Sequence, residues 1–256
     1  MNGKVFGALL LRDAIVARRE IVALLVRTAF QPVLLVVVFG YVLPSMGMIP
    51  RGYATTMVPG VAALCLSMAS LMSVAMPLVV DFGFTKEIED RLLAPIATDL
   101  IAVEKVIVGA LQGFVSAAIV LPLSYLVSGR AAGLSLSHPL LLIVVMLLTG
   151  AAFSSFGLWL GTVMQAQQMQ VIISVIFVPM IMFGCVYYPW SGLEHLPVLK
   201  YAVLINPVVY ASEGLRASLT PAVPHMPLVA IFGALLVSLA VLLSLGLRSF
   251  RKKAIT

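Results

Sequence analysis

Residues 131–193, AAGLSLSHPLLLIVVMLLTGAAFSSFGLWLGTVMQAQQMQVIISVIFVPMIMFGCVYYPWSGL, contain no Asp, Glu, Lys or Arg. A helix needs about 20 apolar residues to cross a hydrocarbon core of about 30 Å, so this stretch is long enough for two crossings joined by a turn. The turn is expected at residues 165–170, where four of the six residues are glutamine. These glutamines could also line a polar path, and both interpretations stay open. The stretch predicts a helical membrane protein.

The rest of the chain is similarly apolar. Of its 256 residues, 62% are hydrophobic and 10% are charged, and the mean hydropathy is +1.13. A soluble domain is about 45–50% apolar and about 25% charged, so a water-soluble enzyme of this size would lack the charge to cover its surface. We therefore predict an all-α integral membrane domain over residues 1–256. Charge-free windows place its six transmembrane helices at about 28–49, 57–80, 106–128, 139–163, 168–188 and 227–247.

Residues 1–27 precede the first predicted span and are rich in charge. Arg12, Asp13, Arg19, Glu20 and Arg27 share an arc of about 120° on a helical wheel. This pattern predicts an amphipathic helix lying in the membrane interface, and the alternative is a cytosolic extension of the first span. The stretch lacks a short apolar core with a cleavage site, so it does not resemble a signal peptide.

The basic residues predict the orientation of the chain. If both termini are cytoplasmic, twelve of the 16 Lys and Arg residues fall on the inner side. The four on the outer side are then Arg51, Arg130, Lys200 and Arg216. Cytoplasmic segments of membrane proteins carry an excess of such residues. We expect a multi-pass protein of the cell (inner) membrane, with lipid as its surroundings and no nucleic-acid partner.

The segment between predicted spans 2 and 3 concentrates charge in a short helix at about 84–94. Glu87 and Arg91 are four residues apart, which supports a helix, and Pro95 ends it. A charged helix with a narrow apolar stripe suits docking to a soluble partner, although a solvated connector that contacts lipid head groups would have the same pattern. The candidate docking residues are Lys86, Glu87, Ile88, Glu89, Asp90, Arg91, Leu92 and Leu93.

The segment at about 190–225 is too long for a simple turn and too apolar for an exposed loop. Its prolines predict short helices that dip back into the outer leaflet. Glu213 and Arg216 are three residues apart and are expected to pair, since a bare charge in lipid costs about 2.5–3.5 kcal/mol. The pair is either a structural salt bridge or part of a gate.

Several kinds of site are missing from the sequence. It has no Gly-x-x-x-x-Gly-Lys-Ser/Thr motif, so the chain has no phosphate-binding loop of its own. The predicted spans contain no Asp, Glu, Lys or Arg, which a proton- or sodium-coupled carrier normally needs. The three histidines show no metal-ligand spacing, and Cys65 and Cys185 are expected to be buried thiols. We expect a transport protein with no metal, no catalytic residues and an external energy source.

Two motifs resemble those of a known family. The first is residues 86–95, KEIEDRLLAP, and the second combines residues 183–189, FGCVYYP, with residues 204–216, LINPVVYASEGLR. The chain resembles a permease of the ATP-binding-cassette type-two exporter family over nearly its whole length. Many members have Gly-Thr before the Leu-Leu pair of the first motif, where this chain has Glu89 and Asp90.

The resemblance implies roles for these segments. Residues 84–94 would be a coupling helix seated on a separate ATPase subunit, and ATP and Mg²⁺ would bind that subunit rather than this chain. Two ATPase copies and two permease chains, probable copies of one another, would form the working unit. Residues 190–225 would be re-entrant helices that close the outer side, with gate residues Tyr187, Tyr188, Pro189, Asn206, Pro207, Tyr210, Glu213 and Arg216.

Spans 1, 2 and 5 would border the transport path in such a permease. Phe30, Gln31, Phe39 and Phe177 lie in spans 1 and 5 and are candidates for contact with substrate. Packing or lipid contact is the favoured alternative for the same residues. We predict export of an amphipathic or hydrophobic compound, such as a drug, lipid or glycan. The alternatives are a secondary carrier or channel without an ATPase, and a membrane scaffold that transports nothing.

Overall fold

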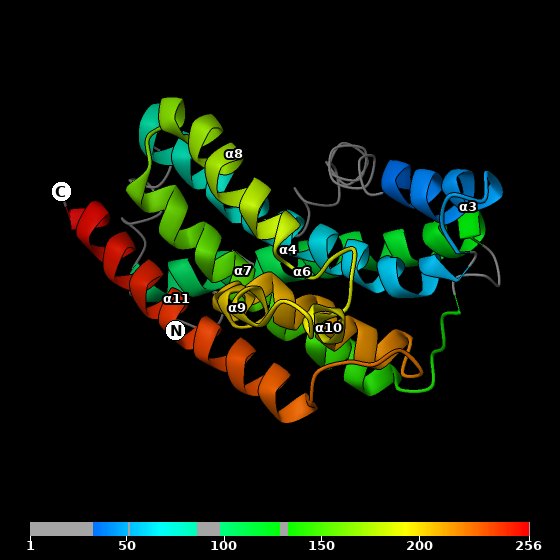
Figure 1. Cartoon of the computed structure of the whole chain (residues 1–256). Coiled ribbons are helices and arrows are strands. Elements are labelled where there is room, and N and C mark those ends of the chain that lie inside the picture. Colours follow the sequence, from blue (N-terminus) through cyan, green and yellow to red (C-terminus); the bar gives the residue numbers. More distant parts are fainter. Residues whose placement is uncertain (1–32, 51, 86–97, 129–132, 256) are drawn as a thin grey trace.

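A computed structural model describes residues 33–50, 52–85, 98–128 and 133–255 of the chain (Figure 1). No strand occurs in these four ranges. Beyond the helical residues 33–37, the elements are η1 (Val38–Val42), α3 (Leu43–Ser45), α4 (Tyr53–Val80), η2 (Asp81–Thr85), α6 (Thr98–Ser128), α7 (Pro139–Val163), α8 (Ala166–Met182), η4 (Trp190–Leu193), α9 (Pro197–Ala202), η5 (Val203–Ile205), α10 (Pro207–Leu219) and α11 (Leu228–Ile255). The predicted interfacial helix at 1–27 and most of the predicted coupling helix lie outside the described residues.

Four helices are long and apolar enough to cross a membrane: α4, α6, α7 and α11. Two further apolar helices, Val33–Ser45 and α8, correspond to predicted spans 1 and 5 but are shorter. The all-helical membrane fold is therefore confirmed for the described residues, and six crossings stay a prediction.

The bounds of the helices differ from the predicted spans, except for α7, which matches 139–163. α6 begins at Thr98 rather than near 106, and α11 continues to Ile255 rather than ending near 247. A charge-free window shows only which residues are apolar. The helix itself is defined by backbone hydrogen bonds, which continue into the charged residues at its ends, so these two helices are longer than the windows. α8 ends at Met182, before the predicted 188, because the chain turns at Gly184 and Cys185.

α4 and α7 form the centre of the bundle. Both pack against α6 and α10, and α11 lies along α7 (Figure 1). Close approach depends on glycines: a Cβ added at Gly157 of α7 would lie 2.4 Å from the Leu71 carbonyl oxygen of α4. A Cβ at Gly113 of α6 would lie 1.8 Å from the Ser70 Oγ atom. In lipid, the hydrophobic effect does not drive apolar helices together, so they associate through close van der Waals packing. Small residues allow the backbones to approach closely enough for such packing.

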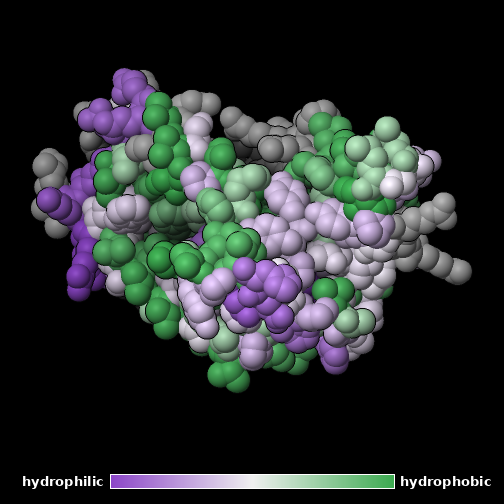
Figure 2. Space-filling view, viewed as in Figure 1, coloured by the Kyte–Doolittle hydropathy of each residue, from purple (hydrophilic) through white to green (hydrophobic). Residues whose placement is uncertain are grey.

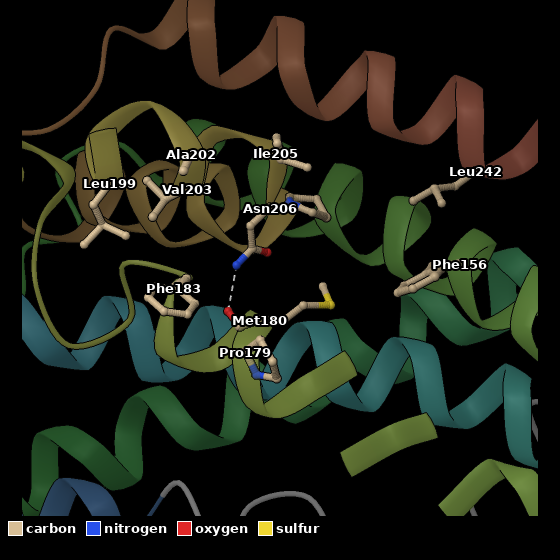
Figure 3. A pocket seen from close by; sticks show the side chains of 11 residues that line it. Phe156, Pro179, Met180, Phe183, Leu199, Ala202, Val203, Ile205, Asn206 and Leu242 are labelled. Carbon is tan, nitrogen blue, oxygen red and sulfur yellow. Dashed lines mark hydrogen bonds between the residues drawn. The ribbon is translucent and has the colours of Figure 1, made fainter. Parts of the chain in front are cut away.

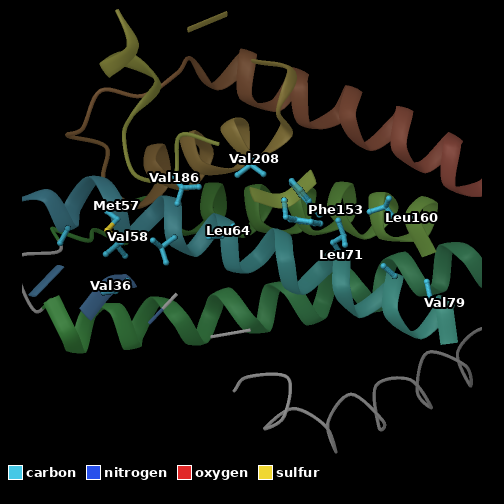
Figure 4. Close-up of a cluster of buried hydrophobic side chains, with 14 residues drawn as sticks. Val36, Met57, Val58, Leu64, Leu71, Val79, Phe153, Leu160, Val186 and Val208 are labelled. Carbon is cyan, nitrogen blue, oxygen red and sulfur yellow. The ribbon is translucent and has the colours of Figure 1, made fainter. Parts of the chain in front are cut away.

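A cluster of buried apolar side chains joins the first helix, α4, α7 and α10 (Figure 4). Leu64 and Leu71 of α4 lie along its middle, with Phe153 of α7 beside them and Val36 at one end. Val186 and Val208 bring the segment after α8 and the start of α10 into the same cluster. The core therefore holds the later segment of the chain directly on α4.

The periphery carries large exposed apolar residues on most of the helices, α8 and α11 among them (Figure 2). Val229 and Val237 of α11 and Val175 of α8 are more than half exposed. Hydrophilic residues gather at the end of the molecule where α8 begins and α11 ends. An apolar girdle with a polar end is typical of a protein that lies in a membrane.

The glutamines between α7 and α8 form a helix start. α7 ends at Val163, and Gln165 is the N-cap of α8. The Gln165 side chain accepts from the Gln168 backbone, and the Gln168 side chain accepts from the Gln165 backbone N–H. This reciprocal cap satisfies donors that a helix start leaves free. It favours the turn over a polar path for these two glutamines.

Candidate functional site

The segment from Trp190 to Leu219 folds into short helices: η4, α9, η5 and α10. Pro197 and Pro207 begin α9 and α10, as the prolines predict. Asn206 caps α10, because its Oδ1 atom accepts from the Val208 N–H at 3.0 Å. Its Nδ2 atom donates to the Met180 carbonyl oxygen at 2.7 Å, which ties α10 to α8. Entry of this segment into the outer leaflet stays a prediction.

Glu213 and Arg216 of α10 form the expected ion pair, and both side chains are fully buried. The Glu213 carboxylate also accepts two backbone hydrogen bonds. Its Oε1 atom accepts from the Trp190 N–H at 2.9 Å, and its Oε2 atom accepts from the Met226 N–H at 2.8 Å. The carboxylate thus holds the start of η4 and the loop before α11.

The Arg216 guanidinium binds two further backbone segments that the Glu213 carboxylate does not contact. Its Nη2 atom donates to the carbonyl oxygens of Cys185 at 2.9 Å and Thr56 at 3.2 Å. Its Nε atom donates to the Thr56 oxygen at 3.3 Å. We call the pair and the four backbone segments that it binds the Glu213–Arg216 hub. The hub joins α10 to the start of α4, the turn after α8, η4 and the loop before α11.

The turn at residues 184–186 is packed tightly against α4 and α10. Cys185 has a φ of +51°, a conformation that is uncommon outside glycine. A Cβ added at Gly60 of α4 would lie 2.0 Å from the Val186 carbonyl oxygen, and one at Gly184 would lie 2.6 Å from Val208 Cγ1. Only glycine at position 60 allows α4 to approach this turn so closely.

Tyrosines surround the turn and stabilise the segments on either side. The Tyr53 hydroxyl donates to the Tyr187 carbonyl oxygen at 2.8 Å, and the Tyr188 hydroxyl donates to the Met182 oxygen at 3.0 Å. The Tyr210 hydroxyl donates to the Leu204 oxygen at 2.8 Å.

Pro189 and Lys200 connect the turn to the short helices. Pro189 is the N-cap residue of η4, directly before Trp190. The Trp190 indole N–H donates to the Lys200 carbonyl oxygen at 3.0 Å, and the Lys200 ammonium lies 4.5 Å from the centre of the indole ring. This cation–π contact holds α9 against η4.

An apolar cavity of about 570 Å³ lies between α7, α8, the short helices and α11 (Figure 3). Met180 and Phe183 line one side, Leu199 and Val203 face them, and Phe156 lies toward the α11 side with Leu242. The complete lining is Phe156, Pro179, Met180, Phe183, Leu199, Ala202, Val203, Ile205, Asn206, Pro207 and Leu242. Asn206 supplies the single polar side chain of the lining, and both ends of its amide are already hydrogen-bonded.

The predicted substrate residues do not line this cavity. Phe39 and Phe177 belong to the buried cluster around α4, and Phe177 is 4% exposed. The Phe39 ring lies 6.4 Å from the Tyr53 ring and 6.1 Å from the Tyr187 ring, centre to centre. Phe30, Gln31 and the eight coupling residues at 86–93 lie outside the described residues. The structure therefore brings together the predicted gate residues but places Phe39 and Phe177 in packing contacts.

Sequence reasoning missed the partners of the hub and the cavity. The backbone groups of Thr56 and Met226 have no local sequence signal, because any residue supplies a carbonyl or, proline aside, an N–H. Phe156 and Leu242 come from helices far apart in the sequence. Within the described ranges, no group of three or more His, Cys, Asp or Glu side chains could hold a metal ion.

The model of the ABC-2 type transporter family matches residues 4–220. The chain belongs to this family. No curated protein matches the chain. The family match makes the chain a membrane transport component, and such components are generally non-catalytic and act with an ABC ATPase. The family match and the apolar helices together make this ABC-2 family member a multi-pass membrane protein. α11 lies beyond the matched residues.

Proposed function

We propose that the chain is the permease subunit of an ATP-driven exporter that moves an amphipathic or hydrophobic compound across the cell membrane. The family match over residues 4–220 carries this proposal. Two ATPase subunits bind ATP and Mg²⁺, and a second permease chain, an identical copy, completes the transporter. The chain lies in the inner membrane with both termini in the cytoplasm.

The coupling residues are Lys86, Glu87, Ile88, Glu89, Asp90, Arg91, Leu92 and Leu93. They follow η2 directly, so a displacement of this segment reaches the end of α4 without an intervening linker. α4 packs against both α6 and α7, which favours rigid-body movement over local bending. Closure of the partner ATPases thus re-sets the membrane helices as a unit.

The Glu213–Arg216 hub acts as the hinge point of the outer gate. It binds four segments through backbone groups, so movement of α4 pulls on the turn after α8 and on the short helices together. The same segments are held in place by six further residues: Tyr187, Tyr188, Pro189, Asn206, Pro207 and Tyr210. The gate opens when α4 shifts relative to α10.

The apolar cavity supports a substrate with a sizeable apolar part. Its volume of about 570 Å³ lies within the range of about 300–1,000 Å³ that ligand pockets occupy. Asn206 supplies the single polar side chain of the lining, and its amide already bonds the Met180 and Val208 backbones, so the cavity favours apolar contacts over polar recognition. An acyl chain or a polycyclic ring fits this chemistry, with any polar part held outside the cavity.

Charge reversal in the coupling segment tests the proposal. We expect Glu87→Lys and Arg91→Glu, each made alone, to abolish ATP-dependent transport of a panel of apolar dyes in vesicles while membrane insertion is unchanged. Arg248→Glu, at an exposed position on α11, is the matched control and should transport normally. Co-purification of the wild-type chain should recover a phosphate-loop ATPase in about equal amount.

Three outcomes would contradict this function. Normal transport by both charge-reversed variants would exclude the coupling role of the segment. Dye flux that persists in vesicles without any ATPase would favour a channel or secondary carrier. A chain that binds an ATPase but moves none of the compounds, even with ATP, would favour a scaffold.

A further inference from the structure

The C-terminal end of α11 contacts the chain on both sides of residues 86–97. Phe82 of η2 lies before this segment, and Asp99 of α6 lies directly after it. Three residues from one stretch of α11, Phe250, Arg251 and Lys253, reach these two positions. α11 lies beyond the residues that the family model matches, whereas Phe82 and Asp99 lie within them.

Arg251 and Asp99 form a two-pronged ion pair. The Arg251 Nε atom donates to Asp99 Oδ1, and its Nη2 atom donates to Asp99 Oδ2. Paired guanidinium and carboxylate groups in this fork geometry fix direction as well as distance. Asp99 lies in the first turn of α6 and Arg251 lies near the end of α11, so each charge also suits the dipole of its own helix.

Phe82 is held by two neighbouring residues of α11. Its ring meets the Phe250 ring edge-on, with 5.9 Å between centres and 69° between planes. The Lys253 ammonium lies 4.8 Å from the centre of the same ring, which is a cation–π contact. Phe250 itself is fully buried among Val74, Leu78, Ile101 and Leu158, so the end of α11 is anchored in the bundle.

We propose that Phe250, Arg251 and Lys253 form a clamp that positions the coupling segment by holding the residues on either side of it. Asp99 and Arg251 are the positioning residues of this clamp. The inference rests on the proposed coupling role of residues 86–93. It adds that α11, which no motif in the sequence singles out, holds the two described ends of the chain that flank that segment.

Because the Arg251–Asp99 pair is exposed, its effect on coupling can be measured apart from its effect on folding stability. The side chains of Arg251 and Asp99 are 59% and 34% exposed. Exposed ion pairs contribute little to folding, so removal of this pair should leave the protein folded. A loss of coupling without a loss of folding is then the signature of a positioning role.

The experiment uses the full chain with its ATPase in lipid nanodiscs, where both faces of the membrane are open to solvent, and reads movement at the short helices. A Val198→Cys reporter is suitable because Val198 is 85% exposed and both native cysteines are buried. Labelling by a membrane-impermeant maleimide is compared with and without ATP and vanadate. The variants are Asp99→Asn, Arg251→Gln, the double exchange Asp99→Arg with Arg251→Asp, and the control Arg248→Gln at an exposed position on the same helix.

We expect each single variant to lower the ATP-dependent change in labelling rate by about fivefold or more, as the loss of a coupling interaction does. ATP hydrolysis and the amount of bound ATPase should stay near wild type. The double exchange should restore part of the change, because the ion pair returns while both helix dipoles oppose it. Arg248→Gln should match the wild type.

Equal labelling changes in the single variants and in Arg248→Gln would overturn the clamp while leaving the proposed function intact. Failure of the double exchange to exceed the single variants would also overturn it, since the charge pair itself would then not matter. If the wild-type chain bound no ATPase, the proposed function would fail first, and the clamp with it.

Discussion

Arg216 is the largest fully buried side chain in the described part of the molecule. A guanidinium in such a position needs a counter-ion and several acceptors, because burial of an unpaired charge is costly. Glu213 supplies the charge, and the carbonyl oxygens of Thr56 and Cys185 accept the remaining donors. Each acceptor belongs to a different segment, so the desolvated charge pair is also what holds those segments together.

Arg216→Met should destabilise the protein by about 3–5 kcal/mol, because it leaves the Glu213 carboxylate buried without its partner. Adding Glu213→Gln to that variant should recover part of the loss, since the uncompensated charge is then gone. Thermal unfolding of the detergent-purified protein measures both effects. The exposed Arg248→Gln is the control and should change stability by less than about 0.5 kcal/mol. Equal melting of Arg216→Met and the control would contradict the argument.

Gly60→Ala should cost about 1–3 kcal/mol, because the new Cβ would lie 2.0 Å from the Val186 carbonyl oxygen and the backbone there must shift. Gly233→Ala in α11 is the matched control, since a Cβ there meets nothing within 4 Å. The control should be neutral or slightly stabilising, as alanine favours helix over glycine. Circular dichroism melts of the two variants compare them directly. An unchanged melting temperature for Gly60→Ala would mean that the turn at residues 184–186 moves away from the new Cβ without a cost in stability.

At the scale of elements, α8 differs from the other long helices. Among the described residues it makes fewer contacts than the other long helices, and several of its apolar side chains are exposed. Its last turn and Phe183 form one wall of the cavity, while α9 and η5 form the opposite wall. The Asn206 amide ties the Met180 end of α8 to α10, so this hydrogen bond helps to set the width of the cavity.

Ala202→Trp should block the cavity and exclude an apolar chain. A photoactivatable acyl chain carrying a diazirine should label peptides that contain Met180, Phe183 or Ile205 in the wild type. The labelling should fall by about tenfold in Ala202→Trp, which corresponds to about 1.4 kcal/mol of lost binding. Val198→Trp, on the same helix but outside the lining, should label as the wild type does. Unchanged labelling in Ala202→Trp would show that acyl chains do not enter here.

The same elements show what a sequence can predict. α7 follows from its charge-free apolar run and from Pro139 at its start, and both are local signals. The end of α8 does not, because Cys185 takes a φ of +51° and cysteine carries no signal for that conformation. The Glu213–Arg216 pair follows from three-residue spacing, whereas its partners come from other helices. Asp99 lies in the first turn of α6, but its partner Arg251 lies far along the chain, so no local signal links the two.

On the scale of the whole molecule, α4 links two groups of contacts. The hub binds Thr56 near its start, and the α11 clamp binds Phe82 just after its end. At about 1.5 Å per residue these positions are about 40 Å apart, comparable to the thickness of a membrane with its head groups. Glycine contacts with α6 and α7 pack α4 closely along this length. The two ends of the protein are therefore connected through a helix that is held on several sides.

The hub has a further consequence for how such a chain can diversify. Thr56, Cys185, Trp190 and Met226 contribute only backbone atoms to it. The side chains at 56, 190 and 226 are thus free to change over evolutionary time without loss of these hydrogen bonds, apart from proline at 190 or 226, which would remove a donor. Position 185 is more restricted, because its φ of +51° disfavours most side chains. Residues that contact the transported compound can therefore change while Glu213 and Arg216 stay the same. A search for distant orthologues should weight those two positions above the aromatic residues around them.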